Sequence, residues 1–202
     1  MTTGISRAGF LQRGVAGGGG LLVSASGLAA FAARDASAST PPDGDLAYLR
    51  LLIAAELLAV DFHGKALSSR RLEHAAQTVS RQIRADESAH YAQLAGLVTA
   101  AGGTPTTAGD IDFSYPKGSF RSQASILRLA GRLEHFMVST YVGAIESLET
   151  PALRLAAGQI VANEAQHEGA LSALRGRPVI GKPFALALPI GAASDALDQF
   201  ES

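Results

Sequence analysis

Two Glu-x-x-His motifs are the part of this chain whose residue types and spacing could do chemistry. They are Glu87 with His90 and Glu164 with His167. Residues three apart lie on one side of a helix, so each pair presents a carboxylate and an imidazole together. Both groups bind divalent transition metals. An isolated match of this kind is weak, because such pairs also arise by chance on solvated helices.

The surroundings of the two motifs favour a buried site over a solvated helix. Each histidine is followed by Leu four and seven residues later, and each pair lies inside an apolar stripe with helical spacing. Buried ionisable groups must be paired or bound to a metal, because their desolvation alone is costly. Two such stripes therefore predict helices that face each other. The stripes are Val79, Ile83, Glu87, His90, Leu94 and Leu97, and Leu153, Ala156, Ala157, Ile160, Glu164, His167, Leu171 and Leu174.

Two further helices are expected to carry one inward carboxylate each, Glu56 and Glu134. Glu56 and Glu87 lie equally far in sequence from the short connection between their helices. Glu134 and Glu164 have the same relation to the second short connection. In an antiparallel hairpin these positions have the same height, roughly 22 Å from the turn at about 1.5 Å per residue. The order Glu, Glu-x-x-His, long connection, Glu, Glu-x-x-His therefore indicates an internal repeat with two half-sites.

The elements that must position these groups are four long helices. Asp45 and Ser119 are the expected caps of the first and third helices, and Pro151 suits the first turn of the fourth. The Gly- and Pro-rich stretch 102–118 is long enough to return along a bundle. We expect helices over 45–67, 71–101, 119–148 and 151–176, a coil packed on the bundle over 177–191, and a short helix over 192–200.

Composition agrees with a single helical domain. The chain has 202 residues, a net charge of −1, no Cys and no Trp. Near-zero charge gives no electrostatic reason to expect nucleic acid or acidic membranes as partners. The absence of Cys excludes disulfides and thiolate ligands. Few aromatic residues beside abundant Ala and Leu favour helices over a β-sandwich.

The first 38 residues are expected to be an export signal. Arg7 and Arg13 precede an uncharged apolar stretch over 14–33, and Ala36-Ser-Ala38 suits cleavage near Ala38. The start resembles a twin-arginine signal with Ala8 in place of the second Arg, which leaves the twin-arginine and general secretory routes open. The alternative is an uncleaved membrane anchor, whereas cleavage leaves no stable membrane insertion. The domains are then 1–38, the bundle over 39–176 and a C-terminal extension over 177–202 packed on the bundle.

Four carboxylates and two imidazoles in one core would repel without counter-ions, and a pair of divalent cations resolves that charge. Oxygen-rich ligands with one imidazole per ion suit iron or manganese. This is the ligand set of ferritin-like di-iron carboxylate bundles. The expected fold class is therefore all-α, a ferritin-like four-helix bundle with a long connection between its second and third helices.

Residues 45–175 also resemble a known family, the ferritin-like domain of exported bacterial proteins related to plant desiccation-related proteins. The resemblance implies the metal ligands Glu56, Glu87, His90, Glu134, Glu164 and His167 for two Fe or Mn ions. The segments that carry it are Glu56-Leu-Leu-Ala-Val-Asp61-Phe62, Ala85-Asp-Glu-Ser-Ala-His90, Asp112-Phe-Ser-Tyr-Pro116, Leu133-Glu134, Tyr141-Val-Gly143-Ala and Ala162-Asn-Glu-Ala-Gln-His167.

Other polar residues have simpler interpretations. His63 follows Glu56 by two turns, and Tyr141 follows Glu134 by two turns. Each is either a core residue or a partner that holds a ligand carboxylate. Asp86 is expected to point away from the site, and Asp61 to lie at the surface or an interface. Glu73, His74, His135 and Glu146 fall off the inward stripes and are expected to be solvated.

Two classes of function fit these residues. The first is a ferroxidase or peroxide-consuming oxidase in stress protection, with metal ions and oxygen or peroxide as partners. The second is a non-catalytic protein that holds metal, or a structural stress- or desiccation-related protein. No sequence signal favours a mineral-storing cage, and a homo-oligomer remains open.

Overall fold

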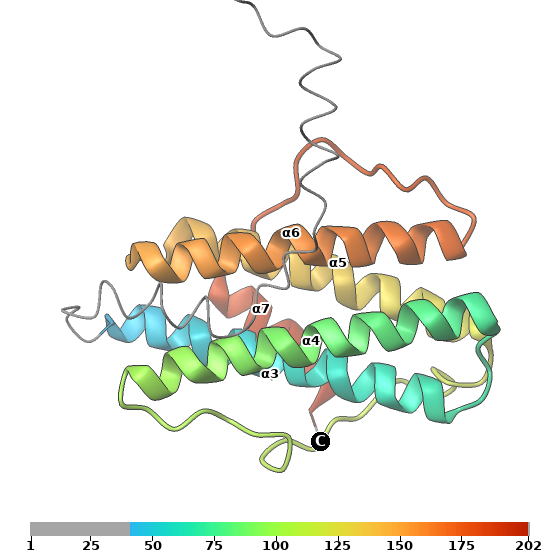
Figure 1. Cartoon of the computed structure of the whole chain (residues 1–202), viewed down its shortest axis with the longest axis horizontal. Coiled ribbons are helices and arrows are strands. Elements are labelled where there is room, and N and C mark those ends of the chain that lie inside the picture. Colours follow the sequence, from blue (N-terminus) through green and yellow to red (C-terminus); the bar gives the residue numbers. More distant parts are fainter. Residues whose placement is uncertain (1–40, 202) are drawn as a thin grey trace, which may run out of the picture. The chain divides into compact units, whose positions relative to one another are not determined.

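The computed structural model of this protein describes residues 41–201, so the expected export signal over 1–38 lies outside the described residues. Within 41–201 the regular structure is helical, with four long helices and one short one (Figure 1). The expected all-α fold is confirmed. The elements are α3 (Asp43–Ser68), α4 (His74–Ala100), α5 (Gln123–Ser147), α6 (Pro151–Leu174), α7 (Ile190–Leu197) and the 3-10 turn η1 (Asp198–Phe200).

The four long helices form two hairpins, α3–α4 and α5–α6, that pack against each other. Near the start of α3, Tyr48 donates a 3.0 Å hydrogen bond to Ser147 at the end of α5. Near the end of α3, His63 lies 3.4 Å from Glu134, earlier in α5. The numbering therefore runs in opposite directions, and α3 and α5 are antiparallel. The connection between α4 and α5 must then run back along the bundle, as its length predicted.

Asp45 does not cap the first helix, which begins at Asp43. Its buried carboxylate instead accepts hydrogen bonds of 2.9 Å from the backbone N–H groups of Glu149 and Thr150. These groups lie in the turn directly before α6, where backbone donors have no partner within the helix. Asp45 thus satisfies the turn of the other hairpin, and ties the beginning of α3 to it.

Ser119 is not the cap of the third helix either. Its hydroxyl donates a 2.7 Å hydrogen bond to the Pro116 carbonyl within the preceding turn. The helix begins later, at Gln123, where Ser122 and Ser125 form a reciprocal capping box. Two polar side chains that satisfy each other's backbone groups stop the helix from extending further back.

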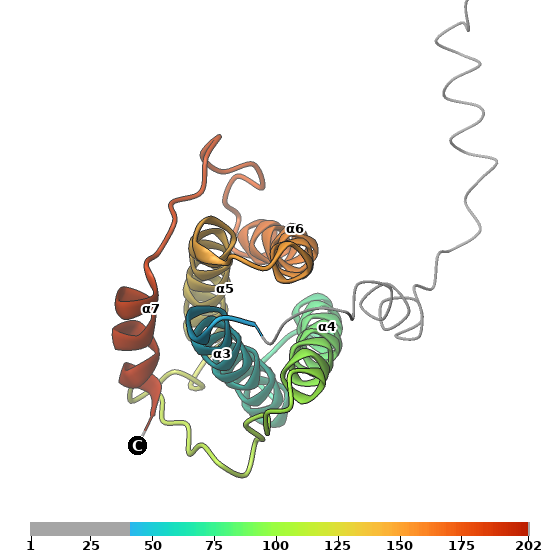
Figure 2. The ribbon, with the colours of Figure 1, turned by 90° about the vertical axis from the view of Figure 1, so that its left-hand side faces the viewer.

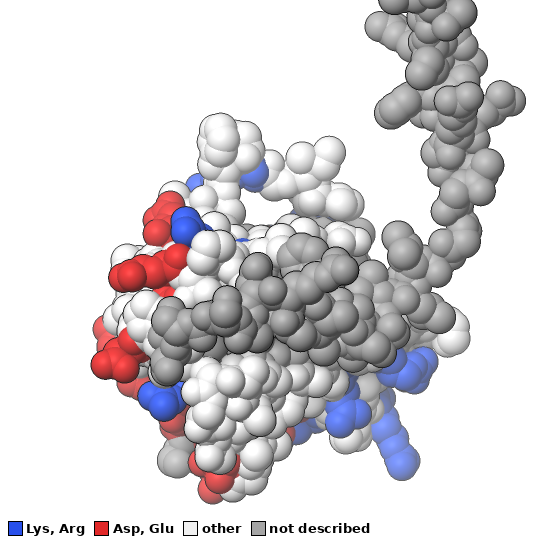
Figure 3. Space-filling model, turned by 60° about the vertical axis from the view of Figure 1, so that its left-hand side comes forward, with Lys and Arg blue, Asp and Glu red and all other residues white. Residues whose placement is uncertain are grey.

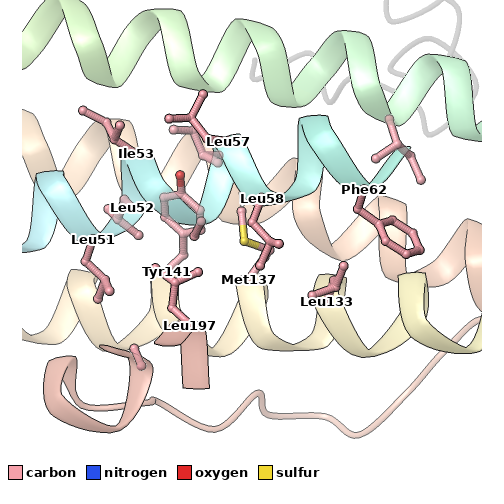
Figure 4. Close-up of a cluster of buried hydrophobic side chains, with 14 of the residues drawn as sticks. Leu51, Leu52, Ile53, Leu57, Leu58, Phe62, Leu133, Met137, Tyr141 and Leu197 are labelled. Atoms are coloured by element: carbon pink, nitrogen blue, oxygen red, sulfur yellow. The ribbon is translucent and has the colours of Figure 1, made fainter. Parts of the chain in front are cut away.

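The interior of the bundle is apolar along most of its length. Tyr141 of α5 lies among these side chains, and its hydroxyl points from α5 into the bundle (Figure 4). Leu197 of α7 packs on the same cluster from outside the four helices. Largest among the fully buried side chains are Tyr141, Phe62, Leu49, Leu52, Ile53, Leu58, Ile83, Leu94, Ile126, Met137, Ile160 and Leu171.

The C-terminal segment leaves α6 and returns to the outer face of α3 and α5, where α7 lies (Figure 2). The Leu188 backbone N–H donates a 2.9 Å hydrogen bond to the Ser139 carbonyl of α5. At Gly143 the two backbones come so close that any Cβ would overlap the Leu188 carbonyl. The stretch before this contact is exposed and includes Ile180 and Phe184.

The described surface carries charges of both signs. On the face shown in Figure 3, acidic side chains gather at one edge and basic ones at another. Among residues 41–201, no helix has the length and apolar character that crossing a bilayer requires.

Candidate metal centre

Four glutamates meet in the middle of the bundle, one from each long helix. They are Glu56 of α3, Glu87 of α4, Glu134 of α5 and Glu164 of α6, and each is 0% exposed. Their heights agree because each hairpin places its two carboxylates at equal distances from its own turn. The apolar stripes predicted from helical periodicity therefore do converge on one polar layer.

The ligand-type atoms of this layer fall into two overlapping groups. The first group is Glu56, Glu87, His90 and Glu164, and the second group is Glu87, Glu134, Glu164 and His167. Within each group, one donor atom per residue lies within 4.8 Å of every other. Glu87 and Glu164 belong to both. The structure therefore brings together all six residues expected as ligands.

Both imidazoles turn their Nδ1 atom toward the carboxylates. His90 Nδ1 lies 2.9 Å from a Glu164 oxygen and 3.2 Å from a Glu87 oxygen. His167 Nδ1 lies 3.2 Å from the other Glu87 oxygen and 3.4 Å from Glu134. The centroids of the two rings are 6.2 Å apart. Each group thus contains one imidazole nitrogen among three carboxylates.

Several buried atoms of the layer lack a hydrogen bond despite these short approaches. Leaving buried polar atoms without partners is costly, so native structures rarely tolerate it unless an ion or water satisfies them. Converging oxygens with one nitrogen are a donor set that divalent iron or manganese accepts. The residues present therefore fit a pair of such ions. The atoms without hydrogen bonds are Glu56 Oε2, Glu87 Oε1, Glu134 Oε2, both carboxylate oxygens of Glu164 and His167 Nδ1.

The carboxyl groups do not share one charge state. Burial, followed by the charge of Glu87, raises the pKa of Glu56 well above its ordinary value. Burial likewise raises the pKa of Glu134. Burial alone would raise the pKa of Glu87 too, but the close approach of the His167 and His90 imidazoles outweighs it and lowers the pKa. Burial and neighbouring charge therefore favour the protonated form of Glu56 and Glu134, whereas the imidazoles favour the ionised form of Glu87.

The imidazoles are held in the charged form. Burial alone would lower the pKa of His90, but contacts with Glu164, Glu56 and Glu87 outweigh it and raise the pKa to about 12. The pKa of His167 is raised for the same reason. Metal ligands must be deprotonated, so ion binding to this layer would release protons from the imidazoles and from Glu56 and Glu134.

Two side chains outside the groups hold the unshared carboxylates. The Tyr141 hydroxyl donates a short hydrogen bond to Glu56. His63 lies with Nε2 3.4 Å from Glu134 and Nδ1 2.8 Å from the Ser80 hydroxyl. Burial lowers the pKa of His63 to about 4, so its ring is neutral. A neutral ring serves both partners if Ser80 donates to Nδ1 and Nε2–H donates to a carboxyl oxygen of Glu134.

Asp86 does not point away from the site as expected. Its Oδ2 lies 3.2 Å from Nε2 of His167, the ring nitrogen that faces away from the carboxylates. Its side chain is 28% exposed, so it also reaches solvent. The available signal was its place directly before Glu87, on the flank of the inward stripe. Ser80 was likewise missed, although it lies two turns before Glu87 on the same face.

The residues expected to be solvated are so. His135 is 62% exposed on its side chain and pairs with Glu168 at 3.1 Å, away from the layer. Asp61 lies at the surface, where it accepts hydrogen bonds from Lys65 at 2.7 Å and from Tyr115 at 2.8 Å. Exposed side chains also include Glu73, His74 and Glu146.

Comparison with known proteins agrees with this arrangement. A search of curated proteins finds no significant match to the chain. A family model described as a ferritin-like domain matches residues 44–177, which span the four long helices and the first residues beyond them. Given a match over most of its length and a bundle with the glutamates and histidines of both hairpins in one layer, the chain belongs to the ferritin-like domain family.

Proposed function

We propose that this protein holds two iron or manganese ions in its central layer and uses them as a ferroxidase or peroxide-consuming oxidase in stress protection. The observation that carries the proposal is the overlap of the two groups at Glu87 and Glu164. Shared carboxylates can hold two ions side by side. Two adjacent ions that each give up one electron would together supply the two electrons that reduce dioxygen to peroxide.

The number of protein ligands also supports turnover. Six residues serve two positions, and two of them are shared. Iron and manganese with oxygen and nitrogen ligands commonly take about six ligands each. Positions are therefore left for small reactants even when every side chain coordinates.

When bound, two ferrous or manganous ions supply two electrons to dioxygen or peroxide, which takes up two protons to give hydrogen peroxide or water. The chain's own residues orient and support that chemistry. His90 and His167 offer Nδ1 toward the carboxylates. Tyr141 and His63 restrain Glu56 and Glu134, so the unshared carboxylates keep their direction. The surrounding leucines and isoleucines keep bulk water out of the layer.

Two surface cavities of about 490 and 530 Å³ lie beside the connection between α4 and α5. Lys65 and Phe113 line both of them, and none of the six ligand-type residues lines either. These two cavities therefore do not reach the proposed ion positions, and the proposal rests on the central layer alone.

The test is an anaerobic titration of the metal-free protein with ferrous iron, followed by addition of oxygen or peroxide. We expect two ions per chain and oxidation faster than in buffer. Glu164→Ala should abolish the acceleration. His74→Ala and Glu146→Gln are matched controls on exposed positions and should keep it. Two bound ions without faster oxidation would rule out the oxidase and support the alternative, a metal-holding or structural protein.

We also propose that the chain is exported and cleaved near Ala38. The support lies in its sequence, where Arg7 and Arg13 precede an uncharged stretch and an Ala-Ser-Ala site. N-terminal sequencing of protein recovered outside the cytoplasm should begin near Ser39. Full-length protein confined to the cytosol would contradict this proposal and leave the metal chemistry untouched.

A further inference from the structure

We propose that Asp86 makes the two ion positions unequal, so that the position of the second group binds its ion first and more tightly. This inference rests on the proposed di-metal function. Asp86 is a positioning residue, since it would act on the ion only through His167.

The contact at His167 fixes how this ring can bind. Its Nδ1 faces Glu87, Glu134 and Glu164, and its Nε2 lies 3.2 Å from Asp86. A carboxylate at Nε2 keeps the proton on that nitrogen and leaves the Nδ1 lone pair free for an ion. It also increases the basicity of the coordinating nitrogen, as outer carboxylates do in many metal sites.

The other hairpin carries an amide at the equivalent place. Asp86 directly precedes Glu87, and Asn163 directly precedes Glu164. Asp86 of α4 contacts His167 of α6. By the internal repeat, Asn163 of α6 occupies the corresponding position relative to His90 of α4. Asn163 is half-buried. An amide oxygen can accept a hydrogen bond but brings no charge, so it supports an imidazole ligand less than a carboxylate does.

The remaining partners of the two groups are balanced. Each unshared carboxylate has one neutral donor, Tyr141 for Glu56 and His63 for Glu134. Glu87 and Glu164 serve both groups alike. Among the described contacts, Asp86 is the one carboxylate outside the layer that reaches a ligand imidazole.

The expected change in affinity can be taken from other metal sites. There, removal of a residue that hydrogen-bonds to a ligand commonly lowers metal affinity about 10- to 100-fold. The Asp86 side chain is 28% exposed, so solvent screens part of its charge. We therefore expect the lower end, a change of about 10-fold in the affinity of one ion.

The experiment is a titration of the metal-free full chain with Mn²⁺, in which free ion is followed by electron paramagnetic resonance. Wild type should bind two ions in two steps. Asp86→Asn should weaken the tighter step about 10-fold and leave the other unchanged. Asn163→Asp should strengthen the weaker step. Far-UV circular dichroism and melting of the metal-free variants show whether folding is intact.

Variants that lack one of the two ion positions show which ion Asp86 affects. Glu56 belongs only to the first group and Glu134 only to the second. In a Glu56→Ala background, Asp86→Asn should weaken the remaining ion, whereas in a Glu134→Ala background it should not. Two bound ions whose affinities Asp86→Asn leaves unchanged, or weakens equally, would overturn the inference alone. A wild-type chain that binds no ion would overturn the proposed function and the inference with it.

Discussion

The hairpins α3–α4 and α5–α6 carry the same ligand types at the same height, yet what surrounds these ligands differs. Two turns beyond its unshared glutamate, α3 has His63 where α5 has Tyr141. Each reaches across to the other hairpin, His63 to Glu134 and Tyr141 to Glu56. The two halves of the repeat therefore have the same ligand residues but differ in the residue that hydrogen-bonds to the glutamate of the other half.

The outer faces of the two hairpins diverge further. Lys65 of α3 occupies the place of Gly143 in α5. Lys65 contacts the connection between α4 and α5, with its ammonium 3.3 Å from the Phe113 carbonyl. Gly143 instead admits the C-terminal segment at Leu188. A pair of similar hairpins can thus share one symmetric core while different segments of the chain cover each outer face.

The symmetry of the ligands predicts the largest effect. Glu164 belongs to both groups, whereas Glu56 belongs to one. At ion concentrations about 100-fold above the dissociation constant, each position should stabilise the fold by about 2.7 kcal/mol. Chemical denaturation with and without Mn²⁺ should show that Glu164→Ala loses most of this gain at both positions and Glu56→Ala loses about half. An undiminished gain in Glu164→Ala would mean that the ions bind elsewhere.

The protons of the layer predict opposite pH trends with and without ions. The raised pKa of His90, about 12 against an ordinary 6.5, stabilises the metal-free fold below pH 6.5, and this stabilisation is lost as the pH rises toward 12. Glu56 and Glu134 have pKa values raised above 4.5, so ionisation of the unfolded chain above pH 4.5 also lowers stability. Glu87, with its lowered pKa, contributes stability that is lost as the pH falls below 4.5.

The metal-free bundle should therefore be most stable near about pH 5 and weaken toward about pH 9. Ion binding displaces protons, so the stabilisation by Mn²⁺ should grow over the same range. Melting curves at several pH values, with chelator or with Mn²⁺, measure both trends. A metal-free protein whose stability rises steadily through this range would contradict the assigned charge states.

The difference between the outer faces predicts a smaller effect. Gly143→Ala places a methyl group against the Leu188 carbonyl and should destabilise the fold by about 1–3 kcal/mol. Gly158→Ala is the matched control in α6, because its Cβ meets nothing within 4 Å. The free energy of unfolding of the control should rise by up to about 1 kcal/mol, because Ala favours a helix over Gly. Limited proteolysis near Ile180 should accelerate in Gly143→Ala alone. Equal stability of the two variants would show that the backbones at Gly143 and Leu188 are not in close contact.

The exchanged partners predict the smallest effect. Tyr141→Phe removes the donor to buried Glu56 and should cost about 1 kcal/mol of unfolding free energy. Tyr48→Phe removes a part-buried hydrogen bond to Ser147 and should cost less, about 0.5 kcal/mol. Urea denaturation of the metal-free variants compares them. A larger loss for Tyr48→Phe would indicate that the Tyr141 contact does not restrain Glu56.

Sequence by itself determined the helices and the six residues that meet in the central layer. Helical periodicity shows which face of each helix is apolar, and Glu56, Glu87, Glu134 and Glu164 stand out because charge is costly there. Equal distances from a short turn then settle their heights. These are local properties, so they can be read without knowing which helices are neighbours.

Only the tertiary structure decided the contacts on the flanks of those faces. Whether Asp86 meets His167, or Asp45 caps the other hairpin, depends on how two helices rotate and cross, and residues far apart in the chain set that geometry. The start of α5 moved to Gln123 because two serines satisfied each other's backbone groups. Gly143 has its role only because Leu188 returns to it. The sequence does not show which backbone group or side chain a short polar residue such as Asp45 or Ser122 will contact. The packing of the helices selects one partner among several.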